Sequence, residues 1–233
     1  MAFLQSRPPR EPFLQAPAAV LWLIAALVLA HVARAIAPAA LSEEILVQYS
    51  FISARYAQGT DVFGLVTLAV PFVSYMFLHA DFIHLGVNCL WLLAFGPIVA
   101  RRYGGFLFLV FFVVCGVAGA ATFLAFNWGS PDGVIGASGA ISGLMGAAIR
   151  MYPWPGSRLA RPMAPILSRP VLLFSGVWFV ANLLFGLTGL GTAGEVHQIA
   201  WQAHVGGYFA GLALAGTFEA LRYRRLSKTP DAG

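Results

Sequence analysis

The sequence predicts an all-α polytopic membrane protein with six transmembrane helices and both termini in the cytoplasm. Three observations support this fold class: the composition, six long apolar runs and an uneven distribution of Lys and Arg. Of the 233 residues, 59% are apolar or aromatic and 10% are charged, whereas soluble domains have roughly 45–50% and about 25%. This apolar excess is too large for one soluble core, so we expect the lipid bilayer to surround most of the chain.

A transmembrane helix needs about 20 predominantly apolar residues. The chain contains six such runs, at 17–37, 77–98, 104–127, 133–151, 170–190 and 199–220. Residues 38–76 combine charged side chains with the apolar segment FGLVTLAVPF, and we expect them to form a loop that is partly embedded in the membrane.

The two ends of the chain are predicted to be short tails. The first sixteen residues carry Pro and Arg but no apolar core of a signal peptide, so the run that follows is expected to remain as the first span. The expected organisation is a cytoplasmic tail at 1–16, one membrane domain at 17–220 and a basic cytoplasmic tail at 221–233.

The orientation follows from the basic residues, because loops rich in Lys and Arg stay in the cytoplasm. With six spans, twelve of the fourteen fall on the side that carries both termini, and only Arg34 and Arg55 fall on the other. The net charge of +5 is therefore a topology signal. No basic stripe is interleaved with aromatic residues, so we exclude nucleic acid as a partner.

The cysteines and histidines do not predict a metal or cofactor. Cys89 and Cys115 lie inside apolar runs, which excludes a secreted disulfide framework and a CxxC metal site. His79 and His84 are five residues apart, a poor spacing for one helical face, and the HExxH motif is absent.

Polar residues inside spans are costly and are functional candidates by default. They occur in four spans, as His79, Asp81, His84, Asn88, Ser138, Ser142, Asn182 and His204. Ser138 and His204 lie one or two turns below the predicted outer surface. His84 and Asn88 share one helical face at a similar depth, so these four side chains are expected to converge. A helix-to-helix bond or a loop cap suffices to explain Asn182 and Asp81.

Glycines predict a close approach between the fourth and sixth runs. They follow Ser138 at Gly139, Gly143 and Gly146, and follow His204 at Gly207 and Gly211, in the small-residue pattern that lets membrane helices pack closely. A serine hydroxyl becomes nucleophilic when a neighbouring base accepts its proton, which predicts a dyad of Ser138 and His204. The nearest carboxylate in the sixth run, Glu219, is about 22 Å further along, so packing is expected to orient the imidazole.

Acyl transfer also requires hydrogen-bond donors for the oxyanion. His84, Asn88 and the backbone N–H of Ser138 are the candidates. Each residue also has a plain structural reading. A serine in a Gly- and Ala-rich span is usually a packing residue, as we expect for Ser142, and an intramembrane histidine such as His204 can be a proton relay or a structural residue.

These residues resemble the motifs of the rhomboid intramembrane serine proteases. The matching motifs are HxxxxHxxxN at His79, His84 and Asn88, GASG at 136–139 and AHVGGYFAG around His204. The resemblance implies a six-helix rhomboid-like bundle in which Ser138 is the nucleophile and His204 the general base. It also implies that His84 and Asn88 stabilise the oxyanion and that the supporting residues are His79, Gly136, Gly139 and Gly207.

The resemblance further implies cleavage of membrane-anchored, often single-pass, protein substrates near the extracytoplasmic side. Substrate helices would enter near the second and fifth spans, with a small residue before the scissile bond, no cofactor and water as the second substrate. Two positions depart from the family. Val70 and Pro71 replace a frequent Trp-Arg pair in the first loop, and Ser142 replaces an aromatic residue that often stacks on the catalytic imidazole; Tyr208 or Phe77 is a candidate substitute.

The alternative function is a catalytically inactive rhomboid-like module that binds transmembrane helices, and the presence of both Ser138 and His204 argues against it. A transporter would show two matching halves with broken helices, and no such repeat is found. The expected location is a bacterial inner membrane, as a multi-pass protein.

Overall fold

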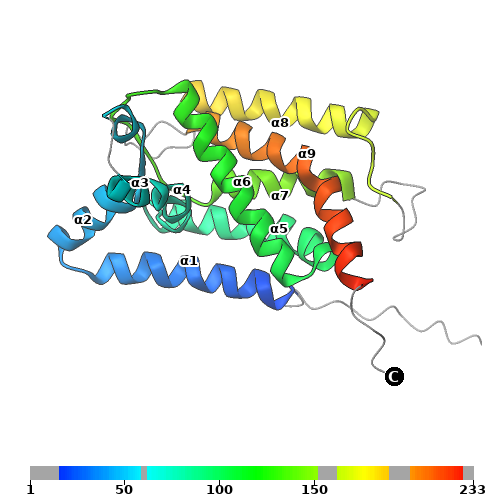
Figure 1. The fold of residues 1–233 in the computed structure, drawn as a ribbon, viewed down its shortest axis with the longest axis horizontal. Coiled ribbons are helices and arrows are strands. Elements are labelled where there is room, and N and C mark those ends of the chain that lie inside the picture. Colours follow the sequence, from blue (N-terminus) through cyan, green and yellow to red (C-terminus); the bar gives the residue numbers. More distant parts are fainter. Residues whose placement is uncertain (1–15, 59–61, 152–161, 189–199, 228–233) are drawn as a thin grey trace, which may run out of the picture.

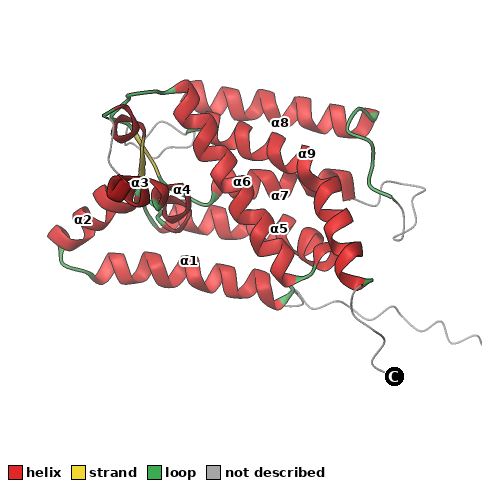
Figure 2. Cartoon of the chain, viewed as in Figure 1, coloured by secondary structure: helices red, strands yellow, loops and turns green. Residues whose placement is uncertain are grey.

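The computed structural model describes residues 16–58, 62–151, 162–188 and 200–227. The described part is almost entirely helical, apart from one short pair of strands (Figure 2). The predicted tails, 1–16 and 221–233, lie outside the described residues except for residue 16 and residues 221–227. The elements in chain order are α1 (Ala18–Ile36), α2 (Ala39–Tyr49), β1 (Phe51–Ile52), η1 (Ser53–Ala57), α3 (Val62–Ala69), α4 (Pro71–Ser74), η2 (Tyr75–Phe77), α5 (Phe82–Tyr103), α6 (Gly105–Phe126), β2 (Gly133–Val134), α7 (Ser138–Met151), α8 (Arg169–Thr188) and α9 (Trp201–Leu226).

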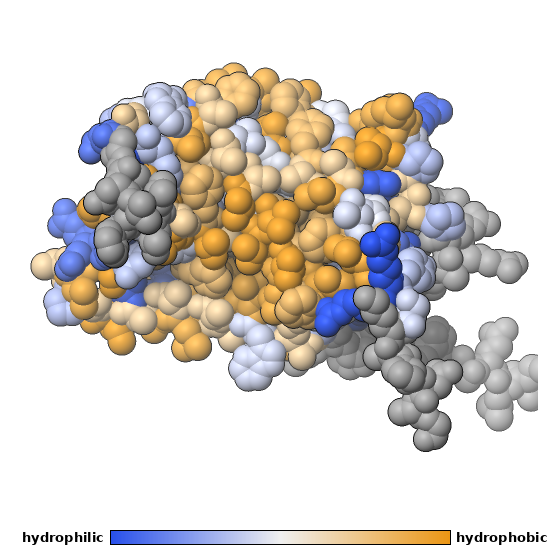
Figure 3. All heavy atoms as spheres, in the orientation of Figure 1, coloured by the Kyte–Doolittle hydropathy of each residue, from blue (hydrophilic) through white to orange (hydrophobic). Residues whose placement is uncertain are grey.

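Within the described residues, four helices are long and apolar enough to cross a membrane: α1, α5, α6 and α8. The surface agrees with this assignment, because apolar residues form a broad band across the middle of the face in Figure 3, and hydrophilic residues gather at both ends. The helices α2, α3 and α4 lie at one end of the molecule, and the end of α9 lies at the opposite end (Figure 1). The chain is a multi-pass integral membrane protein.

The helix α7 differs from its predicted range of 133–151. It begins only at Ser138, because Gly133 and Val134 pair with β1 and Gly136 has a φ of +117°, which a helix does not allow. Its 14 residues reach about 21 Å, less than the roughly 30 Å of a bilayer core. Residues 139–149 are all buried, so α7 is enclosed by the other helices.

The helix α5 also starts later than the predicted residue 77. Residues Tyr75–Phe77 form a 3₁₀ turn, and Asp81 then caps α5 by accepting a hydrogen bond of 2.7 Å from the backbone N–H of His84. A carboxylate in this position satisfies a helix donor that has no partner within the helix. Asp81 therefore caps the N-terminus of α5, one of the two structural roles expected from the sequence.

The segment between α1 and α5 packs around Phe51. Its ring contacts Tyr56, Phe72 and Tyr75, with centroid separations of 5.0, 4.8 and 6.2 Å. Phe51 also pairs with Val134 in the strand ladder, which connects this segment to the loop before Ser138. At the predicted position of the Trp-Arg pair, Val70 precedes Pro71, the first residue of α4. An aromatic cluster braces this loop.

The first loop is also tied to the start of α5 by Arg34, near the end of α1. Its guanidinium donates a 2.6 Å hydrogen bond to the backbone carbonyl of His79 and a 3.1 Å bond to Ser42 Oγ. Because an arginine stays charged and forms several directional bonds, this contact fixes the chain just before Asp81.

The contact between α7 and α9 is made by bare backbone. A methyl group on Gly207 or Gly211 would overlap the carbonyls of Gly139 and Gly143, and a methyl on Gly146 would overlap the carbonyl of Tyr208. The predicted glycine pattern is thus confirmed, since only glycine permits this separation of the two helices.

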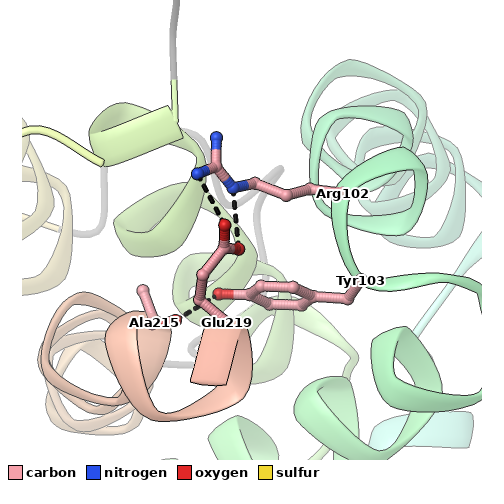
Figure 4. A network of polar contacts seen from close by, with 4 residues as sticks. All are labelled: Arg102, Tyr103, Ala215 and Glu219. Carbon is pink, nitrogen blue, oxygen red and sulfur yellow. Dashed lines mark hydrogen bonds and ion pairs between the residues drawn. The ribbon is translucent and has the colours of Figure 1, made fainter. Parts of the chain in front are cut away.

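At the other end of α5, charged and polar groups connect it to α9 (Figure 4). The Arg102 guanidinium donates two 2.8 Å hydrogen bonds to the Glu219 carboxylate, and the Tyr103 hydroxyl donates a 2.7 Å bond to the carbonyl of Ala215. The Arg102 and Glu219 side chains are only 17% and 13% exposed. A bidentate, poorly exposed pair of this kind is stronger than a surface ion pair, so it fixes α9 against α5.

The helix contact predicts that Gly211→Ala destabilises the protein by about 1–3 kcal/mol through overpacking. Thermal unfolding of the purified protein in detergent measures the effect. Gly216→Ala is the matched control on the same helix, because a methyl group there meets nothing within 4 Å and alanine is the better helix former. Equal unfolding temperatures for the two variants would contradict the close contact.

The cap predicts a pH-dependent loss of stability in Asp81→Ala. The hydrogen bond from the His84 N–H lowers the pKa of the Asp81 carboxyl, so its stabilisation is complete above the ordinary Asp pKa and is lost as the pH falls through the lowered value. The free energy of unfolding of the variant is expected to be about 1 kcal/mol below that of the wild type at pH 7. The difference should be smaller below about pH 4. Unfolding temperatures across pH measure this. Asp81→Asn keeps a capping oxygen that does not titrate, so the contribution of its cap to stability should not change with pH.

Candidate active site

Ser138 and His204 lie within hydrogen-bonding distance of each other, as the sequence predicts. Ser138 is the first residue of α7 and His204 is in the first turn of α9. Their Oγ and Nε2 atoms are 2.7 Å apart. Both side chains are partly buried, so they are shielded by protein while part of each remains accessible. This is the arrangement in which an imidazole can accept a hydroxyl proton.

The other ring nitrogen of His204 has a partner that the sequence prediction missed. Its Nδ1 lies 2.8 Å from Oδ1 of Asn182 on α8, and Asn182 Nδ2 donates a 3.2 Å hydrogen bond to the carbonyl of Trp201. The expectation that packing alone orients the imidazole is therefore wrong. The sixth span offers no carboxylate near His204, and the partner is instead a neutral amide on a neighbouring helix. The signal was a buried Asn in an apolar span.

His84 and Gly136 lie next to Ser138. A methyl group on Gly136 would lie 2.8 Å from His84 Nε2 and 3.7 Å from Ser138 Oγ. This places the outer nitrogen of His84 and the serine hydroxyl around the same glycine. The His84 Nδ1 faces the backbone N–H of Ala80 at 3.4 Å, so Nδ1 acts as an acceptor and, in the neutral ring, Nε2 carries the proton.

Asn88 lies one turn after His84 on α5 and is buried. Its Nδ2 donates a 2.9 Å hydrogen bond to the backbone carbonyl of His84. An amide nitrogen has two N–H groups, and this bond uses one of them. The sequence-predicted pair of His84 and Asn88 thus shares one face of α5.

His79 is fully buried beside this pair. Its ring is 5.1 Å from that of His84 and 6.4 Å from that of His31 on α1, both in edge-on contact. The His79 ring therefore lies behind the ring of His84. Gly139 and Gly207 belong to the contact of α7 with α9 directly beneath Ser138 and His204.

Ser142 and Tyr208 are two of the three residues raised by the missing aromatic, and Phe77 is the third. Ser142 is buried one turn below Ser138. Tyr208 stacks on Trp178 with a centroid separation of 4.1 Å, and its hydroxyl lies 2.7 Å from Ser175 Oγ. Tyr208 therefore connects α9 to α8. Among the described residues, no group of three or more His, Cys, Asp or Glu could hold a metal ion.

The comparison with known families agrees with this geometry. A family model described as "Rhomboid domain" matches residues 67–220, well over half of the chain. The chain belongs to the rhomboid family. The match includes Ser138, His204, Asn182, His84 and Asn88 and leaves out α1 and α2, so it covers less of the chain than the membrane domain expected at 17–220.

Known proteins of this family are similar to the chain over the same part. The chain is 32% identical over 146 residues to a protein named "Rhomboid protease GlpG" from Yersinia pestis (strain Pestoides F). It is 34% identical over 144 residues to one of the same name from Serratia proteamaculans (strain 568). Each match covers 61% of this chain and 46% of the relative, so the chain matches about half the length of these rhomboid proteins.

The geometry at Gly136 predicts that Gly136→Ala disrupts the site. Alanine is strained at a φ of +117°, and its methyl group would press on the His84 ring. A left-handed backbone alone costs roughly 1–2 kcal/mol. We expect a lower unfolding temperature and weaker reaction of Ser138 with a fluorophosphonate. Gly133→Ala is the control, because a methyl there has only ordinary contact with Ile52 at 3.4 Å. Unchanged reactivity in Gly136→Ala would contradict this description.

Proposed function

We propose that the chain is an intramembrane serine endopeptidase that hydrolyses peptide bonds of membrane-anchored protein substrates. The observation that carries the proposal is the 2.7 Å separation of Ser138 Oγ and His204 Nε2. Membership of the rhomboid family and relatives named as rhomboid proteases support the same reaction class.

The first half of the reaction forms an acyl-enzyme. Ser138 Oγ attacks the carbonyl carbon of the scissile bond while His204 Nε2 accepts the hydroxyl proton. The same nitrogen then gives this proton to the leaving amine as the carbon–nitrogen bond breaks. In the second half, water attacks the ester carbonyl while His204 Nε2 accepts a proton from it. His204 then gives this proton to Ser138 Oγ as the ester carbon–oxygen bond breaks, which releases the acid product and restores the serine. No metal or cofactor is needed for these steps.

Three donors are proposed for the oxyanion of each tetrahedral intermediate. They are Nε2–H of His84, the second N–H of the Asn88 amide and the backbone N–H of Ser138. The first N–H groups of a helix have no partner within it, and Ser138 is the first residue of α7. Donors fixed before the reaction begins are the most effective form of such stabilisation.

We infer a six-span topology with both termini in the cytoplasm. In this topology the six spans are α1, α5, α6, α7, α8 and α9, in a membrane domain at 17–220 between cytoplasmic tails at 1–16 and 221–233. The short helix α7 would end near the cytoplasmic surface at Arg150 and begin below the outer surface at Ser138. The distribution of Lys and Arg supports this orientation, and the relatives' bacterial origin supports a bacterial inner membrane.

Single-pass or otherwise membrane-anchored proteins are the proposed substrates. Their helices would approach laterally near α5 and α8, and cleavage would occur on the extracytoplasmic side, after a small residue. Both helices carry large apolar side chains on their exposed surface, among them Trp91 on α5 and Phe185 on α8, which supports this approach.

The dyad predicts that Ser138→Ala abolishes labelling by a fluorescent fluorophosphonate in detergent-solubilised protein. His204→Ala should slow labelling by roughly 10²- to 10⁴-fold, the usual contribution of a general base. Labelling followed on a gel, with thermal unfolding as the check of folding, measures both effects. Ser142→Ala is the matched control one turn along α7 and should label like the wild type.

Two outcomes would overturn the proposal. Undiminished labelling of either dyad variant would show that another group reacts. No labelling of folded wild type, in detergent and in lipid, would favour the inactive helix-binding module.

A further inference from the structure

We propose that Asn182 is a positioning residue that holds His204 in the one tautomer able to activate Ser138. This inference rests on the proposed function, because it assigns a role beside the Ser138–His204 pair. It makes the site a linear array of three side chains from α7, α9 and α8, in which a neutral amide takes the place that a carboxylate holds in a Ser-His-Asp triad.

The hydrogen bonds of Asn182 define which of its atoms faces the imidazole. The carbonyl of Trp201 can only accept, so the amide atom beside it at 3.2 Å must be Nδ2. The atom 2.8 Å from His204 Nδ1 is then Oδ1, which can also only accept. The Trp201 carbonyl thus removes the usual ambiguity in the orientation of an asparagine amide.

The tautomer of His204 follows from this orientation. Facing an acceptor, Nδ1 must carry the proton, and in the neutral ring Nε2 is then unprotonated. The unprotonated nitrogen is the one that lies 2.7 Å from Ser138 Oγ. The opposite tautomer would place a lone pair of Nδ1 against Oδ1 and an N–H against the serine, which would remove the base.

The surrounding helices hold Asn182 in place. Asn182 is buried on α8, one turn before Gly186. A methyl group on Gly186 would lie 2.6 Å from the Cβ of Trp201, so α8 approaches the start of α9 closely at this point. That approach lets a short amide side chain reach both the Trp201 carbonyl and the imidazole.

The test compares Asn182→Leu with the wild type in detergent, using the rate of Ser138 phosphonylation by a fluorophosphonate rhodamine. In this step the Ser138 Oγ–phosphorus bond forms, the phosphorus–fluorine bond breaks, fluoride leaves and the serine proton passes to His204 Nε2. We expect a slowing of about 10- to 100-fold, smaller than removal of a general base. Asn182→Asp keeps an acceptor beside Nδ1 and should recover most of the rate lost in Asn182→Leu.

Asn127→Leu is the control for losing a partly buried amide that donates one hydrogen bond to a backbone carbonyl. Asn127 Nδ2 donates a 2.9 Å hydrogen bond to the carbonyl of Phe123 at the end of α6, outside the site. This variant should label at the wild-type rate. Thermal unfolding of all variants separates loss of folding from loss of reactivity.

A second readout reports the tautomer without any reaction. The ¹⁵N resonances of labelled histidine, with His204 assigned by its loss in His204→Ala, should show the Nδ1–H form in the wild type and a mixed or reversed form in Asn182→Leu. Wild-type labelling with an unchanged rate and tautomer in Asn182→Leu would overturn the role of Asn182. Absence of wild-type labelling with the Nδ1–H form present would instead overturn the proposed function.

Discussion

The close contact of α7 with α9 is the constraint on which the rest of the structure depends. Because Gly139, Gly143, Gly207 and Gly211 present bare backbone to one another, a short hydroxyl on one helix and an imidazole on the other meet at 2.7 Å. A side chain at Gly207 or Gly211 would overlap the backbone of α7 and separate the helices. Other helices support this contact by binding to α9. Arg102 on α5 forms an ion pair with Glu219 on α9, and Asn182 on α8 contacts His204 on α9.

The surroundings of Ser138 combine rigid backbone with partial access. The strand pair holds the segment before α7, and Gly136 supplies the left-handed turn that lets the helix begin at Ser138. Asp81 and Arg34 fix the start of α5 and so the position of His84. In the proposed reaction, such fixed dipoles stabilise the charge that develops on the substrate. Asp81 and Arg34 thus define the start of α5 beside the site.

Residues that form short motifs within one segment could be predicted from the sequence. Contacts between helices that are distant in the sequence could not. The motifs around His84, Ser138 and His204 identified the converging side chains, and the glycine spacing gave the helix contact. Hydropathy alone placed the starts of α5 and α7 too early. The apolar runs begin before these helices do, because the cap at Asp81 and the strand pair at Gly133 keep the preceding residues out of the helices. Asn182 was missed as a partner of His204, because the pattern of apolar residues along α8 does not identify the neighbouring helix that its buried amide faces.

The central claim is that the helix contact activates one particular hydroxyl, Ser138. Peptide mapping by mass spectrometry of the wild-type protein after reaction with a fluorophosphonate tests it most directly, because Ser142 lies on the same helix one turn away and is an internal comparison. A single adduct on Ser138 is expected. An adduct on Ser142 or on a serine outside the site, with Ser138 unmodified, would contradict it.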